Sequence, residues 1–297
     1  MIWDFPYDSP QAITKLLTES GFAMSKKFGQ NFLISPTARK RIADTVMLGS
    51  GRDVWEIGPG IGSLTALLLT HNVQLTAFEI DRGFVSILRE QAFPEVANFR
   101  LIAGDVLKTW YPLFEAEGTP DTICGNLPYN IGSICIARFL EAKCHPQRMV
   151  FTLQREVGER LAAGPGSKLW ATLSILAQID YDVHIEFTIR PGSFYPPPQV
   201  DSVVVRMEKR AASLVNPDVR DLFLLLIRDL FAQRRKTVRN NLLRGTLGGR
   251  LGKDVLLASL ASAGIAESER AERLSIPQLV QLAETLDTAQ SFQASIH

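Results

Sequence analysis

The chain has 297 residues, 46% of them hydrophobic and 21% charged, and its net charge at pH 7 is +1. These values are typical of globular proteins with a sizeable core, and they exclude a chain that is disordered throughout. The longest apolar runs, such as residues 222–227, are far shorter than the roughly 18 residues that a membrane-spanning helix needs, so no membrane association is expected.

The first ten residues carry acids and prolines where a secretory signal would carry a basic and then an apolar stretch, so a cytoplasmic protein is expected. Three cysteines and four histidines form no CxxC or HExxH pattern, which argues against a disulfide framework and a metal site. These residues are Cys124, Cys135, Cys144, His71, His145, His184 and His297. The even charge balance means that a nucleic-acid partner has to be argued from local charge.

Two helices are predicted at the start of the chain. Ser9-Pro10 combines a capping serine with a proline at the first helical position, which predicts a helix over residues 11–20. Ser35-Pro36 repeats this signal and predicts a second helix that ends near residue 47. Residues 22–33 lack periodicity and are expected to form a loop.

From Asp53 onward, short apolar runs alternate with longer amphipathic ones, a pattern typical of βαβ units around a parallel sheet. Strands are predicted at residues 54–57, 74–79, 99–103, 122–125 and 148–153. After a helix near residues 168–178, alternation at 181–189 and 202–207 predicts an antiparallel pair at the sheet edge. The fold class is therefore α/β, with a Rossmann-like, mostly parallel sheet and an antiparallel edge strand.

The strand pattern ends near residue 210, and helical periodicity continues beyond it, with amphipathic helices expected at 255–263 and 276–286. We therefore predict a larger domain over residues 1–210, which contains the sheet. A smaller helical domain is predicted over residues 211–297.

A glycine-rich turn follows the first sheet strand, in the sequence Glu-Ile-Gly-Pro-Gly-Ile-Gly-Ser of residues 56–63. Glycines such as Gly58 let the backbone approach a ligand closely. The next strand ends at Glu79, where an acid can accept hydrogen bonds from the two hydroxyls of a ribose. Asp105 follows the third strand, so three strand ends offer polar groups to a nucleoside.

Ser63 stands where a dinucleotide-binding turn has its third glycine, and an acid, Glu56, precedes the turn. A cationic sulfonium needs no anion-binding turn, so this pattern favours a methyl donor, S-adenosylmethionine, over a pyrophosphate. A nicotinamide-dependent dehydrogenase is the alternative from the same kind of fold.

The fourth strand leads into Asn126-Leu127-Pro128-Tyr129. An amino group on an aromatic base is a poor nucleophile, and acceptors aimed at its hydrogens help to pyramidalise it. The Asn126 side-chain oxygen and the Leu127 carbonyl can each accept one such hydrogen, Pro128 stiffens the turn, and Tyr129 can stack on an extruded base. Phe194, before a run of prolines, is a second candidate wall. An ordinary turn and simple core packing are the alternatives for these two segments.

Between residues 228 and 250 the chain has seven basic side chains and one acid, a pattern typical of phosphate binding. Helical spacing of the apolar residues at 227, 231, 238 and 242 predicts a face packed on the core, with Arg235 and Arg239 projecting together elsewhere. A merely solvated basic helix is the alternative.

Taken together, these segments resemble the ribosomal RNA adenine N6,N6-dimethyltransferases of the small ribosomal subunit. The segments that carry the resemblance are residues 27–33, 56–60, 79–81, 104–105, 126–129, 153–157, 194–202 and 233–240. The resemblance implies a class I methyltransferase sheet that binds S-adenosylmethionine through Asn31, Leu33, Gly58, Glu79, Asp105 and Asn126. It also implies a target base enclosed by Asn126, Leu127, Pro128, Tyr129 and Phe194.

The implied substrate is a pair of adjacent adenines near the 3′ end of the RNA in the immature small subunit, with a role in ribosome maturation. RNA contacts are expected at Arg234, Arg235, Lys236 and Arg239. A monomer is expected, because the substrate itself supplies a large surface.

The chain departs from the family pattern at Trp170-Ala171, where Tyr-Gly is usual. Relatives that methylate a large-subunit adenine typically have isoleucine at the position of Leu127, so Leu127 disfavours that group. Mitochondrial transcription-factor relatives are disfavoured because the N-terminus here is not transit-like. A non-catalytic RNA- or ribosome-binding assembly factor with the same fold is the alternative from another functional class.

Overall fold

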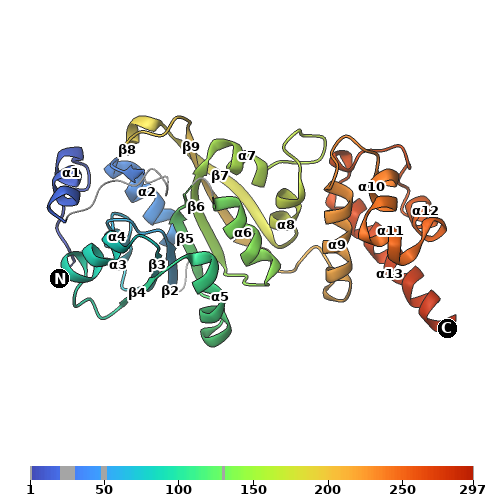
Figure 1. Ribbon diagram of the computed structural model, residues 1–297, viewed down its shortest axis with the longest axis horizontal. Coiled ribbons are helices and arrows are strands. Elements are labelled where there is room, and N and C mark those ends of the chain that lie inside the picture. Colours follow the sequence, from blue (N-terminus) through green and yellow to red (C-terminus); the bar gives the residue numbers. More distant parts are fainter. Residues whose placement is uncertain (1, 21–30, 48–51, 129–130, 297) are drawn as a thin grey trace. The chain divides into compact units, whose positions relative to one another are not determined.

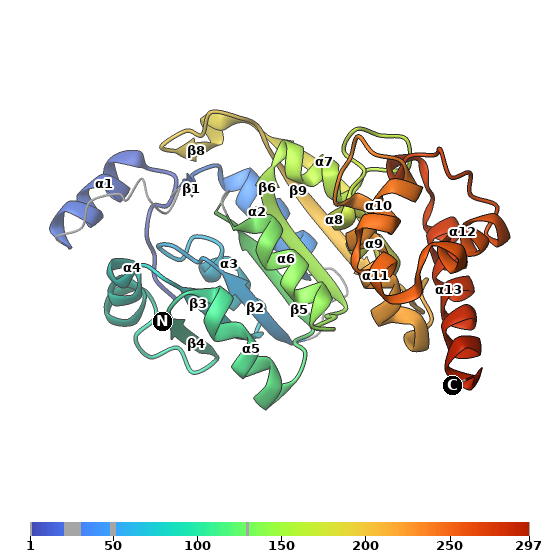
Figure 2. The ribbon, with the colours of Figure 1, turned by 45° about the vertical axis from the view of Figure 1, so that its right-hand side comes forward.

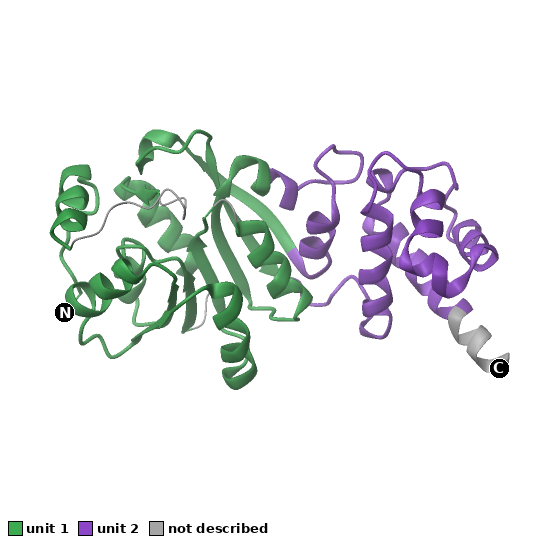
Figure 3. Ribbon diagram, viewed as in Figure 1, with its two compact units in different colours: residues 1–158, 182–209 green, residues 159–181, 210–297 purple. Residues whose placement is uncertain are grey.

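A computed structural model describes residues 2–20, 31–47, 52–128 and 131–296, with side chains as far as residue 289. The chain divides into two compact units, coloured green and purple in Figure 3. The first unit holds residues 1–158 and 182–209, and the second holds residues 159–181 and 210–297. Contacts therefore group residues 159–181 with the C-terminal helices. The division into a cofactor-binding part, 1–210, and an RNA-binding part, 211–297, stays a prediction.

Figure 1 labels the elements in chain order. The strands are β1 (Phe32–Leu33), β2 (Asp53–Ile57), β3 (Gln74–Glu79), β4 (Phe99–Ala103), β5 (Thr122–Asn126), β6 (Arg148–Gln154), β7 (Tyr181–Ile189), β8 (Phe194–Tyr195) and β9 (Ser202–Lys209). The α-helices are α1 (Pro10–Glu19), α2 (Pro36–Met47), α3 (Thr65–Leu69), α4 (Arg82–Ile87), α5 (Val106–Glu117), α6 (Gly132–Glu141), α7 (Arg155–Leu161), α8 (Thr172–Asp180), α9 (Arg220–Phe231), α10 (Val238–Arg244), α11 (Thr246–Leu251), α12 (Lys253–Ser262) and α13 (Ile276–Ile296). Shorter helical turns are η2 (Leu88–Ala92), η3 (Pro191–Ser193), η4 (Pro217–Val219) and η5 (Ala271–Arg273).

The main sheet has seven strands in the order β4-β3-β2-β5-β6-β9-β7. The first five of these strands are parallel, and β9 runs antiparallel to β6. All five predicted parallel strands are present, and the predicted edge pair, β7 and β9, lies side by side. Helices α5 and α6 cover one face of the sheet in both views (Figures 1 and 2). The predicted α/β fold, mostly parallel with antiparallel strands at one edge, is confirmed.

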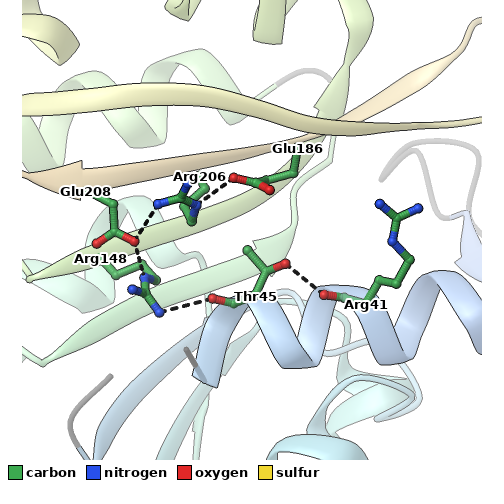
Figure 4. Close-up of polar contacts among 6 residues, drawn as sticks. All are labelled: Arg41, Thr45, Arg148, Glu186, Arg206 and Glu208. Carbon is green, nitrogen blue, oxygen red and sulfur yellow. Dashed lines mark hydrogen bonds and ion pairs between the residues drawn. The ribbon is translucent and has the colours of Figure 1, made fainter. Parts of the chain in front are cut away.

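A ladder of arginine and glutamate side chains crosses β6, β9 and β7 (Figure 4). Arg148 Nε donates to Glu208 Oε1 at 2.6 Å, and these two residues are opposite each other in the strand register. Arg206 donates to Glu208 and to Glu186 at 2.8 and 2.6 Å. Partial burial alone would raise the pKa of Glu208, but the hydrogen bonds from the two arginines hold it below its ordinary value. Arg148 Nη1 also donates to the Thr45 carbonyl at 3.2 Å, so the ladder fixes the register and ties α2 to the sheet.

Both N-terminal helices begin where the sequence predicts. The Ser9 side chain accepts the Ala12 amide at 3.2 Å at the start of α1, and the Ser35 side chain accepts the Ala38 amide at 3.3 Å at the start of α2. Each hydroxyl thus satisfies one of the amides that a helix leaves unpaired in its first turn.

A second, two-stranded sheet was not expected from the sequence. Strands β1 and β8 are antiparallel, with Phe32 opposite Tyr195 and Leu33 opposite Phe194. Each strand has only two residues, and one lies in the predicted loop over residues 22–33. Two residues are too few to show the alternation by which strands are recognised in a sequence.

The second unit is helical, and the predicted helices at 255–263 and 276–286 correspond to α12 and α13. The expectation of one helical run over residues 227–242 was wrong, because α9 ends at Phe231 and α10 begins only at Val238. The Thr237 hydroxyl accepts the Asn240 amide at 3.3 Å and caps α10, so a second helix starts at this point. The Asn241 side chain donates to the Leu230 carbonyl at 2.6 Å and so satisfies the C-terminal end of α9.

The departure at Trp170-Ala171 is accommodated within the second unit. Trp170 is buried, and its indole nitrogen donates to the Leu274 carbonyl at 3.0 Å. Ala171 has extended backbone dihedrals at the start of α8, a conformation that needs no glycine. Asp180, at the end of α8, forms a buried pair with both terminal nitrogens of Arg220, at 3.0 and 2.6 Å.

Among the helices that the structure describes, none has both the length and the apolar character needed to cross a lipid bilayer.

Candidate functional site

The carboxyl ends of β2, β3, β4 and β5 surround one cavity, together with β1. Ligands of open α/β sheets bind at this edge, where loops rather than strands provide the surface. Eight of the residues predicted from the sequence line it: Asn31, Leu33, Gly58, Glu79, Asp105, Asn126, Leu127 and Pro128. The structure therefore brings into one place residues that are up to 97 positions apart, since Asn31 and Pro128 both line the cavity.

The glycine-rich turn is left-handed at three of its glycines. The φ angles of Gly58, Gly60 and Gly62 are 69°, 58° and 88°. Residues with a Cβ rarely adopt such positive φ angles. The Gly58 amide donates to the Phe78 carbonyl at 2.9 Å, which anchors the turn to β3. Gly58 and Gly60 line the cavity, whereas a Cβ on Gly62 would lie 2.7 Å from the Phe93 ring. Gly58 and Gly60 thus form part of the cavity wall, whereas Gly62 leaves room for the Phe93 ring.

Glu79, at the end of β3, is held by two backbone amides. Its Oε2 accepts the Gly60 amide at 3.0 Å, and its Oε1 accepts the Asp81 amide at 2.8 Å. The side chain is buried, and burial raises the pKa of Glu79 to about 7 despite these hydrogen bonds. Each carboxylate oxygen keeps a further lone pair, so the group can accept additional hydrogen bonds from a ligand in the cavity.

A second buried carboxylate, Glu56, lines the floor of the same cavity. Its Oε2 accepts the hydroxyl of Thr65, the first residue of α3, at 2.7 Å. Burial, together with the neighbouring charge of Glu79, raises the pKa of Glu56 to about 7 despite the hydrogen bond from Thr65. Two carboxylates that would share negative charge at one site favour a ligand that carries a positive charge.

Asp105 lies at the end of the loop after β4, where it both caps a helix and lines the cavity. Its side chain accepts the Leu107 amide at 3.0 Å and so caps α5, and it also lines the cavity. The Gly104 amide donates to the Glu79 carbonyl at 2.7 Å, which brings this loop next to the end of β3.

Asn126 is the last residue of β5, and its amide group is oriented by the chain. Its Nδ2 donates to the Asn31 carbonyl at 3.1 Å, so the nitrogen end of the amide faces the segment before β1. The Leu127 amide donates to the Thr152 carbonyl of β6 at 3.2 Å. The Pro128 carbonyl accepts two amides at the start of α6, at 3.1 and 3.2 Å. The Asn-Leu-Pro turn is thus fixed on both sides.

Tyr129 and Phe194 are the two aromatic residues expected to enclose a base, and the structure describes only Phe194. Tyr129 lies outside the described residues, as do residues 27–30 of the motif at 27–33. Phe194 is buried and is not among the residues that line the cavity. It lies opposite Leu33 in the β1–β8 pair, and Leu33 does line the cavity, so Phe194 is one strand away from it.

Sequence reasoning missed the apolar walls of the cavity. Ile80, which is 44% exposed, Phe84 and Val106 line it as well, and Phe84 packs edge-on against Phe32 with ring centroids 5.6 Å apart. Ile80 and Val106 each follow directly after an acid at a strand end, Glu79 and Asp105. Their position in the sequence was therefore a usable signal, because the residue after such an acid must also face the sheet edge.

The basic segment of residues 234–239 follows α9 and ends in the first turn of α10, within the second unit, and its side chains differ in what they contact. Arg234 donates to the Lys168 carbonyl and lies 3.5 Å from Glu272, and Arg239 Nε lies 3.2 Å from Glu267. Arg235 and Lys236 are exposed, and neither has an ion-pair partner in the part of the chain that the structure describes. Two of the four predicted RNA contacts are therefore occupied by protein groups.

The mostly parallel sheet, its glycine turn and the acids at its carboxyl edge define a Rossmann-like methyltransferase. Solved structures that share the fold include two methyltransferases. The dimethyladenosine transferase from Plasmodium falciparum has a TM-score of 0.74 at 24% identity, over 86% of this chain and 97% of that one. The 23S rRNA methyltransferase ErmE has a TM-score of 0.65 at 25% identity, over 86% of this chain and 100% of that one.

Sequence similarity identifies the family to which the chain belongs. Residues 21–288 match the family described as Ribosomal RNA adenine dimethylase, and the chain belongs to this family of methyltransferases. It is 41% identical to the Ribosomal RNA small subunit methyltransferase A of Treponema denticola, over 94% of this chain and 95% of that protein. The identity to the protein of the same name from Treponema pallidum is 43%, over 94% and 97%.

Proposed function

We propose that this chain transfers methyl groups from S-adenosylmethionine to the N6 amines of two adjacent adenines near the 3′ end of small-subunit ribosomal RNA. The observation that carries the proposal is the Asn126 amide, pinned by the Asn31 carbonyl at the wall of a cavity that also holds Glu56 and Glu79. The relatives named as small-subunit methyltransferases cover nearly the whole chain, which supports the choice of substrate.

The cavity residues fit this methyl donor. Glu79 has lone pairs left for the two ribose hydroxyls, and Ile80 and Val106 offer apolar surface for an adenine ring. Glu56 and Glu79 give the cavity the negative charge that suits a sulfonium cation. Asn31, Leu33, Gly58 and Asp105 complete the proposed contacts. When bound, S-adenosylmethionine supplies an electrophilic methyl group with a good leaving group.

The target amine is proposed to meet acceptors on the Asn126-Leu127-Pro128 turn. Because Nδ2 of Asn126 is engaged by the Asn31 carbonyl, its Oδ1 is the end of the amide left for one N6 hydrogen. The Leu127 carbonyl would accept the other hydrogen, and Pro128 restricts the turn. These acceptors localise the lone pair on N6, and the proton leaves to solvent after transfer, so positioning and electrostatics supply the rate enhancement. Tyr129 and Phe194 are the proposed aromatic walls for the extruded base.

RNA binding is proposed for Arg234, Arg235, Lys236 and Arg239. Arg235 and Lys236 are exposed and suit direct phosphate contact, whereas Arg234 and Arg239 hold the segment in shape through Glu272 and Glu267. The proposed partner is the immature small subunit, and the proposed state is a cytoplasmic monomer.

The test is methyl transfer by the purified protein to immature small subunits that lack the modification, with labelled S-adenosylmethionine. We expect label in dimethyladenosine, two per subunit, and none in subunits that are already modified. RNA binding without transfer would contradict the proposal and favour an assembly factor. Binding of NAD, with no binding of the sulfonium donor, would favour a dehydrogenase.

A further inference from the structure

Residues 2–20 precede the segment that matches the family, residues 21–288, and they pack on the elements that carry the proposed site. The apolar face of α1, formed by Ile13, Leu16 and Leu17, is buried. These side chains share one core cluster with Leu33 and Phe194. The N-terminal segment is therefore part of the same packed body as the cavity wall.

Two contacts attach this segment at separate points. The Tyr7 ring lies under the buried Arg39 guanidinium of α2, with the carbon of that group 5.4 Å from the ring centroid. On α1, the Thr14 hydroxyl lies 2.9 Å from the Tyr195 hydroxyl of β8. Figures 1 and 2 show α1 on the side of the unit where β8 lies. The segment thus connects α2 to β8.

The direction of the hydroxyl contact follows from the other bond that Thr14 makes. Its only hydroxyl proton is donated to the Pro10 carbonyl at 2.8 Å, so its oxygen is an acceptor toward Tyr195. Tyr195 is therefore the donor. Replacing either partner removes the bond, whereas serine at position 14 keeps it.

This bond acts on the strand that holds the proposed base wall. Tyr195 pairs with Phe32, and the preceding residue, Phe194, pairs with Leu33 at the cavity. The Ile34 amide donates to the Ser193 carbonyl at 2.8 Å and fixes the other end of β8. With only two residues, β8 has few ladder bonds of its own, so an added anchor at Tyr195 restricts where Phe194 can lie.

We propose that Thr14 and Tyr195 are positioning residues, which hold β8 so that Phe194 is aligned with the target adenine. The proposal rests on the function proposed above. It makes the N-terminal segment, outside the matched family region, a contributor to turnover through one hydroxyl pair. Cofactor contacts are not part of this pair, so cofactor affinity should be unaffected.

The experiment compares Thr14→Val, Tyr195→Phe, the double variant and Thr14→Ser in the full chain. We expect kcat for methyl transfer to fall about two- to tenfold in either single variant, which is the range of one net hydrogen bond. The double variant should fall no further, and Thr14→Ser should retain the wild-type rate. The dissociation constant for S-adenosylmethionine should stay within twofold throughout. Thr18→Val is the matched control, because Thr18 is on the same helix and bonds only within it, to the Thr14 carbonyl.

Each outcome is decisive. Additive losses in the double variant, or an unchanged kcat in both single variants, would overturn the proposal. Equal losses in kcat and cofactor affinity together with a lower melting temperature would show a role in stability alone, and would also overturn it. If the wild-type protein transfers no methyl group while it binds the cofactor normally, the proposed function fails instead, which is a different result from an insensitive pair.

Discussion

The sheet edge that carries the proposed cofactor site and the basic segment of residues 234–239 are both predicted from short motifs, but they differ in how the chain holds them. At the sheet edge, Glu79 and Asn126 are the final residues of parallel strands, and main-chain groups orient each side chain. In the basic segment, the chain leaves one helix before it enters the next, and Arg234 turns toward protein carbonyl and carboxylate groups. A motif at a strand end therefore predicts where its side chains lie, whereas a cluster of basic residues in the sequence does not predict which of them face solvent.

The largest expected effect comes from Asn126→Ala. Loss of an acceptor aimed at the reacting amine should lower kcat about 100-fold, as for other preorganised polar groups in active sites. The dissociation constant of S-adenosylmethionine should change much less, because Glu79 is untouched. Single-turnover methyl transfer measures the rate, and Gln91→Ala, an exposed amide on η2, is the matched control. A rate within threefold of wild type would show that the Asn126 side chain does not act on the reacting amine.

Next in size is Glu79→Gln, which leaves one of the two backbone amides at this site without an acceptor. It also removes a charge near the proposed sulfonium. We expect the dissociation constant of S-adenosylmethionine to rise about 30-fold, as for the loss of charge-assisted hydrogen bonds. Titration calorimetry measures it, with Glu90→Gln, an exposed acid, as the control. Unchanged affinity would mean that the donor binds elsewhere.

The affinity for S-adenosylmethionine is expected to fall as the pH is lowered. Burial raises the pKa values of Glu56 and Glu79 to about 7, so acidification below pH 7 neutralises both carboxyls. Affinity for the cationic donor should therefore fall about tenfold between pH 8 and pH 6. The demethylated product is a neutral thioether and should lose less. Equal pH profiles for donor and product would show that the carboxylates do not sense the sulfonium.

The smallest effect separates Arg235 and Lys236 from Arg234 among the basic residues. Arg235→Ala and Lys236→Ala should each weaken RNA binding and lower the slope of log affinity against log salt by about 1. Arg234→Ala should instead lower the melting temperature, since Arg234 contacts Lys168 and Glu272. Filter binding at several salt concentrations and thermal unfolding give the two measurements. An equal salt slope in all three variants would remove the distinction.

The parallel strands and both N-terminal helices could be predicted, because capping serines and uninterrupted apolar runs are local signals. The β1–β8 sheet could not, since two residues show no period and their pairing depends on residues more than 160 positions apart, Leu33 and Phe194. The helix break at 232–237 was missed for a related reason. The apolar residues at 227, 231, 238 and 242 have the spacing of one continuous helix, although they belong to two separate helices, α9 and α10.

Within the site, residues named by motifs were found, and those without a motif were not. Eight of the predicted residues line the cavity, whereas the apolar Phe84 carries no recognisable signature, and Ile80 and Val106 are indicated only by the acid that precedes each of them. The Thr14–Tyr195 contact also lay beyond sequence reasoning, because neither hydroxyl belongs to a pattern and only the fold brings them together.

The most direct test of the central claim is a structure of the protein with S-adenosylmethionine or its demethylated product. The ribose hydroxyls should lie within hydrogen-bond distance, about 2.7–3.2 Å, of the Glu79 carboxylate, with the sulfur facing Asn126. A ligand bound away from β3 and β5, or a ribose without contact to Glu79, would contradict the account.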